Sequence, residues 1–214
     1  MAQDIRLSAA PIRDKHFYQQ VARLHISGIN QGFLPQLGLG FMILLYEAID
    51  DCPSSVLLAE CVEGKVLGFV SGTISMKPIY RRLMCKPIQL FVSLLPSLVR
   101  PRRLKRIFEI LHYSRQSHSQ ELASLPAFEL LSIVVAPVAR GTGCADRLYR
   151  NLILYCKSKD IADFKIVVGD ALAPAHNFYK RMGAVSVGRI EVHSGEDSVI
   201  YVHKILSDQE LKND

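Results

Sequence analysis

The sequence lacks the features of a disulfide-stabilised, zinc-binding or membrane-spanning protein. Its 214 residues include five cysteines, an odd number without a CxxC pair, so neither a disulfide framework nor a zinc site is indicated. The longest nearly uncharged apolar stretch, residues 88–99, is interrupted by Pro96 and is shorter than the about 20 residues that cross a bilayer. The first twenty residues carry charges without an apolar core, so no signal peptide is expected. These absences predict a soluble protein of a reducing, cytoplasmic compartment.

Acidic residues are scarce in one segment. The net charge is +6, but residues 81–115 carry nine basic side chains against one acid, Glu109. Residues 102–115 have apolar and basic faces at helical spacing, which predicts a basic amphipathic helix. The stretch from Arg100 to Arg115 has three open interpretations: a solvated cover of a substrate cleft, a contact for an anionic membrane, or a contact for an acidic carrier protein. Nucleic acid is not expected, because no aromatic residue is interleaved with the basic run before Phe108 and no reader motif is present.

The pattern of apolar residues predicts one α/β domain over residues 1–214. Nearly half of the chain is apolar, and no segment has the composition of an interdomain linker. Glu63 and Gly64 form the expected turn of an initial hairpin. The connection at 76–125 is long, and such a connection is either structured or functional. Helices are expected at 16–30, 41–49, 144–159 and 174–182, and strands at 56–62, 65–74, 128–135, 165–168, 185–192 and 199–204.

A glycine loop follows the strand at 128–135. Residues 140–145 read RGTGCA and open a segment with helical apolar spacing, so the order is strand, glycine loop, helix. Two glycines let the main chain approach a ligand closely, and the first turn of the helix offers N–H groups without helical partners. The spacing matches neither a Walker A loop nor a GxGxxG dinucleotide fingerprint. The loop therefore indicates a site for an anion such as a pyrophosphate.

Two motifs in this region carry a family resemblance. The stretch IVVAPVARGTGCADRL resembles the acyl-CoA-binding motif of the GNAT superfamily of N-acetyltransferases, with its RxxGxA core. Downstream, AHNFYKRMGA is close to the AxxFYxxxGF signature of the same family, although this chain has Leu172 at a frequent asparagine position and Ala184 in place of the final phenylalanine. The resemblance implies the GNAT fold, a mixed and mostly antiparallel sheet flanked by helices, with acetyl-CoA as acyl donor and no metal. Residues 76–125 would then be a helical insertion before the central CoA-binding strand.

The resemblance also implies how an acyl-CoA is held. The loop main chain would bind the pyrophosphate, and N–H groups near Val134 and Val135 would polarise the thioester carbonyl where the strand parts from its neighbour. Asn177 would hydrogen-bond the cofactor, or it is a solvated helix residue. The expected cofactor-binding residues are Ile133, Val134, Val135, Arg140, Gly141, Thr142, Gly143, Cys144, Ala145, Asn177 and Tyr179.

Acyl transfer to an amine requires a base, because an alkylamine with a pKa of about 10 is protonated near neutral pH. Glu129 is the first candidate, directly or through a water relay, since strand alternation places it on the face of Leu131 and Ile133. It is otherwise an exposed glutamate at a strand start, and Glu60 is a weaker candidate. Tyr179 matches the tyrosine that many GNAT enzymes place near the thioester sulfur as general acid, and core packing is its other interpretation.

Cys144 raises the question of a covalent mechanism. A thiol at a helix N-terminus has a lowered pKa and can act as a nucleophile. No histidine lies near it in the sequence, so a small buried cysteine is the simpler interpretation. The histidines at 112, 118, 193 and 203 have no metal-ligand spacing, and none of them is assigned a role.

Together these features predict an acetyl-CoA-dependent N-acetyltransferase that acts by direct transfer on a primary amine of a small molecule. Residues 32–46 faintly resemble a region of bacterial members associated with surface-sugar modification, and a basic insertion suits an anionic acceptor. An amino sugar or a nucleotide-linked amino sugar is therefore favoured. The alternative is a GNAT-fold binding protein whose basic insertion docks on an acidic carrier protein or an anionic membrane. A homodimer could form through the final strands and the insertion.

Overall fold

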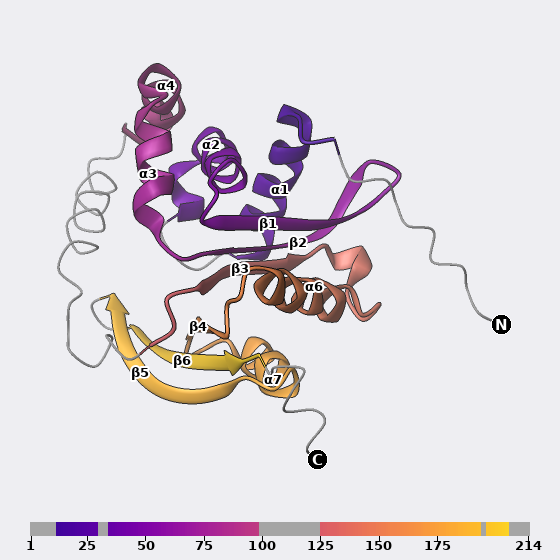
Figure 1. Ribbon diagram of the computed structural model, residues 1–214. Coiled ribbons are helices and arrows are strands. Elements are labelled where there is room, and N and C mark those ends of the chain that lie inside the picture. The colour runs from indigo at the N-terminus through magenta and orange to yellow at the C-terminus, as the bar shows by residue number, and fades with distance from the viewer. Residues whose placement is uncertain (1–11, 30–33, 99–124, 194–195, 206–214) are drawn as a thin grey trace, which may run out of the picture.

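The computed structural model describes residues 12–29, 34–98, 125–193 and 196–205. Six strands form one sheet in the order β1–β2–β3–β4–β6–β5 (Figure 1). All neighbouring strands are antiparallel except β3 and β4, which are parallel, so the mixed, mostly antiparallel sheet is confirmed. The strands are β1 (Ser55–Val62), β2 (Lys65–Thr73), β3 (Glu129–Val135), β4 (Asp163–Gly169), β5 (Val185–His193) and β6 (Glu196–Lys204).

Helices cover both faces of the sheet. α1 (Lys15–Gly28) and α2 (Leu39–Asp50) lie on one side of β1 and β2, and α6 (Cys144–Ser158) lies on the other side (Figure 1). α7 (Ala173–Arg181) lies near β6. Two short 3-10 helices, η1 (Leu34–Leu37) and η3 (Pro137–Ala139), precede α2 and α6. The helices and strands expected from apolar spacing within the described residues form, with ends within three residues of the prediction.

The connection after β2 begins with two further helices, α3 (Met76–Met84) and α4 (Pro87–Leu98). The Ser75 hydroxyl caps α3 by accepting a hydrogen bond from the Lys77 N–H. The basic helix expected at 102–115 lies outside the described residues. Of the helices that the structure describes, none has the length and apolar character needed to cross a membrane.

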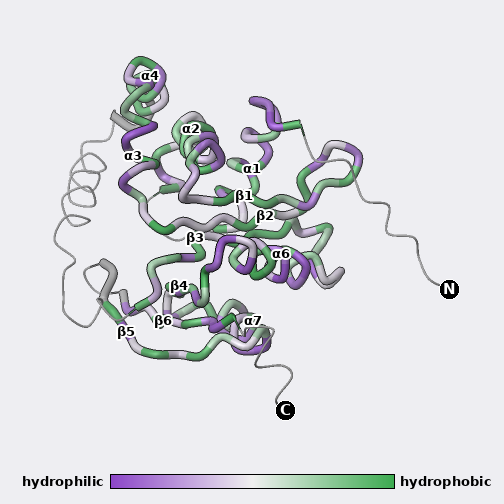
Figure 2. Tube along the Cα trace, in the orientation of Figure 1, coloured by the Kyte–Doolittle hydropathy of each residue, from purple (hydrophilic) through white to green (hydrophobic). Residues whose placement is uncertain are grey.

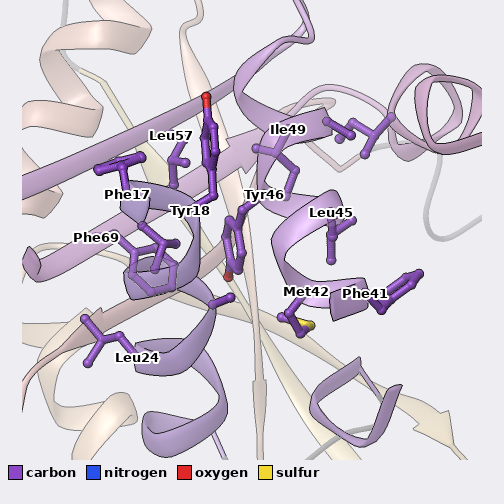
Figure 3. Close-up of a cluster of buried hydrophobic side chains, with 14 of the residues drawn as sticks. Phe17, Tyr18, Leu24, Phe41, Met42, Leu45, Tyr46, Ile49, Leu57 and Phe69 are labelled. Atoms are coloured by element: carbon purple, nitrogen blue, oxygen red, sulfur yellow. The ribbon is translucent and has the colours of Figure 1, made fainter. Parts of the chain in front are cut away.

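The apolar core has one part on each face of the sheet. The α1–α2 core packs these two helices against β1 and β2, with Phe17, Met42, Tyr46 and Phe69 among its buried side chains (Figure 3). The α6–α7 core packs the other two helices against β3, β4 and β6. Its buried members include Leu148, Leu152, Phe164, Ile166 and Tyr201. β1, β2 and β3 thus contribute side chains to both parts of the core, so β3 lies between two packed layers.

A β-bulge interrupts β3 at Leu131. Ser71 of β2 pairs with Ser132, and the next residue, Gly72, pairs with Leu130, so Leu131 has no partner in this ladder. Leu131 packs against the α1–α2 core, whereas Ile133 packs against the α6–α7 core. The expectation that Leu131 and Ile133 both share a face with Glu129 is therefore wrong for Ile133, because the bulge shifts the alternation by one residue after Leu131.

The two parallel strands separate after their first contacts. β3 and β4 pair only at Glu129 with Lys165 and at Leu130 with Ile166, although both strands continue for several residues. The main chain of β3 beyond the bulge therefore has β2 on one side and no strand partner on the other. The separation expected near Val134 is confirmed, and it begins directly after the bulge.

Candidate functional site

A cavity of about 670 Å³ lies where β3 and β4 have separated, between the start of α6 and α7. The end of β3 forms one wall, the glycine loop a second, and α7 a third. The end of α1 also reaches it, because Gly28 packs so closely on Val134 that a Cβ there would lie 2.4 Å from Val134 Cγ1. The cavity is lined by Gly28, Ile133, Val134, Val135, Ala139, Arg140, Gly141, Gly143, Cys144, Ala145, Asp146, Pro174, Ala175, Phe178, Tyr179 and Arg181.

The glycine loop presents main-chain donors to this cavity. Gly141 and Gly143 both have φ +77°, a backbone conformation that residues other than glycine rarely adopt. Gly143 is the N-cap of α6 without a capping side chain, and the first helical bond runs from the Arg147 N–H to the Gly143 carbonyl at 3.0 Å. The N–H groups of Cys144, Ala145 and Asp146 precede that bond and have no helical partner. A Cβ on Gly141 would meet no atom within 4 Å, so the loop is open at this point.

Three predicted cofactor residues of this loop occupy different positions. Arg140 is exposed and lines the cavity. Thr142 does not line it, because both its N–H and its hydroxyl donate to the Ala139 carbonyl, at 3.4 and 2.8 Å. Cys144 lines it but is 1% exposed. Burial, together with the nearby Glu60 carboxylate, raises the pKa of the Cys144 thiol to about 12, which opposes a nucleophilic role.

Glu60 holds the start of α6 in place. Its carboxylate accepts from Arg147 Nε and Nη2 at 3.1 and 2.6 Å, and Arg147 Nη1 donates to the Thr142 carbonyl at 2.8 Å. Glu60, the weaker candidate for a base, is therefore ion-paired and ties the loop to β1. This network orients the glycine loop.

The separated part of β3 offers a second set of main-chain donors. The Ala136 N–H donates to the Leu67 carbonyl of β2 at 2.8 Å. Because successive N–H groups of a strand point alternately to its two sides, those of Val135 and Ile133 point toward β4 and that of Val134 points toward β2. Val134 instead contributes its side chain to the wall. The donors of this strand that face the cavity side are thus those of Ile133 and Val135.

Tyr179 lies on α7 at the third wall of the cavity. Its side chain is 6% exposed and contacts Tyr149, Phe178 and Tyr201 through its ring. Within the part of the chain that the structure describes, its hydroxyl has no hydrogen-bond partner. Burial raises the pKa of Tyr179 above its ordinary value, so the phenol stays protonated at neutral pH.

Glu129 begins β3 at the end away from the glycine loop, and it does not line the cavity. Its side chain is half-buried, and Lys165 Nζ lies 3.9 Å from its carboxylate. Burial raises the pKa of Glu129, and the charge of Lys165 lowers it in part. A carboxylate with a raised pKa is a stronger proton acceptor, so its electrostatics suit a general base.

Two neighbours on α7 have separate roles. Asn177 is exposed and does not line the cavity. His176 holds α7 to the sheet: its Nδ1 lies 2.9 Å from the Tyr201 hydroxyl, and its Nε2 lies 3.2 Å from the carbonyl oxygens of Gly169 and Asp170. Among the described residues, His176 is the one of the two that bonds to neighbouring elements, and these bonds fix the helix that carries Tyr179.

A buried polar chain behind β3 was not predicted from the sequence. His25 Nδ1 hydrogen-bonds the Tyr46 hydroxyl, which lies 3.1 Å from Ser132 Oγ, and Ser132 Oγ lies 2.8 Å from Ser71 Oγ. All four side chains are buried in the apolar layer between α1, α2 and the sheet. Burial lowers the pKa of His25 to about 4, so the imidazole is neutral. The only sequence signal was a pair of serines inside two apolar strands.

The chain is similar to known proteins in part of its sequence and in its fold. Residues 98–184 match the sequence model described as the Acetyltransferase (GNAT) family. No curated protein matches the chain. Among the residues that the structure describes, no group of three His, Cys, Asp or Glu side chains could hold a metal ion.

Solved structures of N-acetyltransferases share the fold. One from Staphylococcus aureus Mu50 is 15% identical and covers 90% of this chain and 95% of its own, with a TM-score of 0.56. An aminoglycoside 6'-N-acetyltransferase complexed with coenzyme A is 12% identical over 93% of this chain and 97% of its own, with a TM-score of 0.59. Ard1 from Thermoplasma volcanium is 13% identical over 91% and 95%, with a TM-score of 0.56. At these identities the likeness concerns the fold.

Proposed function

This chain has the GNAT fold and carries a GNAT-family acetyltransferase domain at residues 98–184, and from this premise we propose that it transfers an acetyl group from acetyl-CoA to a primary amine of a small molecule. The observation that carries the proposal is the cavity at the separation of β3 and β4. It combines a glycine loop with unpaired N–H groups, an open strand edge and a protonated tyrosine.

The residues of the cavity fit an acyl-CoA. The N–H groups of Cys144, Ala145 and Asp146 would hold the pyrophosphate at the positive end of α6. The N–H groups of Ile133 and Val135 would bind the acyl arm along β3, and one of them would polarise the thioester carbonyl. Arg140 adds positive charge at the rim, and Arg181 offsets the charge of Asp146 there. The bound cofactor supplies an acetyl group that is already activated as a thioester.

The remaining chemistry is proton movement. The amine nitrogen forms a bond to the carbonyl carbon as the carbon–sulfur bond breaks, so the amine must lose a proton and the departing thiolate must gain one. Glu129 does not line the cavity, so it would accept the amine proton through a water relay, or directly from an acceptor that extends beyond the cavity along β3; its raised pKa favours proton uptake. Tyr179 would donate a proton to the sulfur as the carbon–sulfur bond breaks. The thiol that forms has a pKa of about 8.5, so the sulfur accepts a proton only as negative charge develops on it.

The acceptor class follows from charge and from the fold neighbours. We favour an anionic amino sugar or nucleotide-linked amino sugar, because the insertion is rich in arginine and arginine suits phosphates and carboxylates. A fold neighbour is an aminoglycoside N-acetyltransferase, whose acceptor is also a small amine. In the other interpretation of the sequence the GNAT fold serves binding alone, and no observation favours this loss of activity over an enzyme. The five free cysteines support a reducing, cytoplasmic location.

We also propose that the protein forms a homodimer, through a contact that lies outside the acyl-CoA cavity. β5 ends the sheet, and Val185 and Val187 are 66% and 51% exposed on it. An exposed edge with apolar side chains can pair with the same edge of a second copy. Light scattering after size-exclusion chromatography measures the oligomeric state directly.

The cofactor site is tested by isothermal titration with acetyl-CoA. Gly141→Glu and Gly143→Glu place bulk and negative charge where the pyrophosphate would bind, and we expect both to abolish micromolar binding. Gly64→Glu is the matched control, because Gly64 has φ +75° and open space like Gly141, but it lies in the turn of the β1–β2 hairpin and does not line the cavity. Binding should survive in the control. Absence of binding by the unaltered protein would overturn the proposal, and positive titrations justify a screen of amino sugars by thiol release.

A further inference from the structure

Helix α4 is apolar on both sides, although within the described residues only one side packs against the core. Leu90 and Leu94 are partly buried against the α1–α2 core. On the other side, Ile88, Phe91 and Val92 are 78%, 60% and 58% exposed. Their i, i+3 and i+4 spacing places these three residues, called here the α4 face, on one side of the helix.

Exposed apolar side chains concentrate at this place. Met84, the last residue of α3, is 69% exposed, so four of the eleven large apolar side chains that are exposed in the described part of the chain fall within residues 84–92. A helix that is apolar all round is ordinarily covered on every side. Contiguous exposed apolar surface marks an interaction site. The α4 face therefore has the character of a surface that another body covers.

α3 supplies positive charge next to this helix. Lys77, Arg81 and Arg82 are exposed, and none of the three has an ion pair with another residue that the structure describes. Residues 74–98 contain no aspartate or glutamate. Lys86, between the two helices, is already paired with Glu47 at 2.6 Å. The two helices together, residues 76–98, are called here the α3–α4 arm. Its charged side chains without an ion pair to a described residue are thus all positive.

We propose that the α3–α4 arm binds an anionic lipid surface, with the α4 face in the boundary between headgroups and acyl chains and with Lys77, Arg81 and Arg82 on lipid phosphates. Charge complementarity selects the anionic surface, and the aliphatic and aromatic side chains select a membrane boundary over a purely polar partner. The arm forms one extremity of the molecule, and hydrophobic residues run along α4 there (Figure 2).

This placement leaves the acyl-CoA cavity free. α4 lies at one end of the molecule, and α7, which forms a wall of the cavity, lies toward the other end (Figure 1). The protein bound through α4 therefore keeps the cavity open to solvent. Lipid binding and acetyl-CoA binding are consequently independent, so failure of one proposal is distinguishable from failure of the other.

The test is flotation of the full chain with phosphatidylcholine vesicles that contain or lack phosphatidylserine. The unaltered protein is expected to float with the phosphatidylserine vesicles and to remain behind with phosphatidylcholine alone. The double variant Ile88→Glu and Phe91→Glu should lose this binding. Reversal of charge at Lys77, Arg81 and Arg82 should weaken it by at least about a hundredfold, since each basic side chain at the surface contributes severalfold. Leu154→Glu is the control, because Leu154 is 62% exposed on α6, away from the arm.

Several results would overturn the inference. One is an unaltered protein that floats with neither vesicle, and another is a double variant that floats as well as the unaltered chain. A third is a dimer that the double variant dissociates, which would make a second copy the cover of the α4 face. Binding to polyglutamate without binding to vesicles would assign the arm to an acidic protein. Thermal melts and acetyl-CoA titrations establish that each variant is folded, and Ile88→Ser with Phe91→Ser replaces the double variant if it melts early.

Discussion

Arg181 on α7 holds Asp146 in the first turn of α6, with Nη1 and Nη2 at 2.8 and 2.9 Å from the two carboxylate oxygens. Both residues line the cavity. The hydrogen bonds and charge of Arg181 lower the pKa of Asp146, so the carboxylate is ionised near neutral pH. The pair therefore joins two walls of the cavity and neutralises a negative charge where a pyrophosphate would bind.

Arg181→Ala is expected to weaken acetyl-CoA binding severalfold, because it removes a cation and leaves the Asp146 carboxylate uncompensated at the start of α6. Asp146→Asn should leave binding unchanged or improve it. Titration of the two single variants and the double variant separates these effects. Loss of affinity in Asp146→Asn as large as in Arg181→Ala would show that the pair acts by holding the two helices together and not by charge.

Tyr179→Phe keeps the ring packing and removes only the hydroxyl. If the hydroxyl donates to the departing sulfur, kcat should fall by about a hundredfold while acetyl-CoA affinity stays within twofold. Thiol release at saturating acetyl-CoA measures the first quantity, and titration measures the second. Phe178→Leu, which alters the adjacent ring of the same helix, is the control for packing. A Tyr179→Phe variant with undiminished kcat would restrict Tyr179 to the core.

As the proposed base, Glu129 should determine the pH at which activity falls on the acidic side, called here the acidic limb of the pH profile. A base must be deprotonated, so activity should fall as the pH falls through the pKa of Glu129, which burial has raised. Lys165→Met removes the charge that lowers this pKa, so the limb should move to higher pH. Lys204→Met on β6 alters an exposed charge elsewhere and should leave the limb in place. A limb that stays fixed in Lys165→Met, or that persists in Glu129→Gln, would transfer the role of base to another group.

Local signals in the sequence predicted most of the scaffold. Helical spacing gave α6 and α7, and the two glycines at 141 and 143 predicted the loop that the structure forms. These features depend on residues that are near one another along the chain, so no knowledge of the partner segments is required. The separation of β3 from β4 was expected from family resemblance, not from the residues of the strand.

The features that escaped prediction depend on distant pairs. The bulge at Leu131 requires the register of β2 against β3, which alternation within one strand does not contain. Arg181 and Asp146 are 35 residues apart, and Tyr46 and Ser132 are 86 apart. α4 falls within the helical insertion expected at 76–125, but its bounds and its exposed side were not predicted. The exposure of an uncharged apolar stretch is visible only when the neighbouring helices are in place.

Tyr46 and Tyr149 are buried tyrosines whose hydroxyls have opposite surroundings. The Tyr46 hydroxyl bonds His25 and Ser132, whereas the Tyr149 hydroxyl has no partner among the described residues. Tyr46→Phe should therefore lower the free energy of unfolding by about 1–3 kcal/mol, because it leaves buried polar groups unpaired. Tyr149→Phe removes an unpaired group and should be neutral or stabilising by up to about 1 kcal/mol. Urea denaturation of the two variants measures both changes, and equal losses would mean that the hydrogen-bonded Tyr46 hydroxyl contributes no more to stability than the unpaired Tyr149 hydroxyl does.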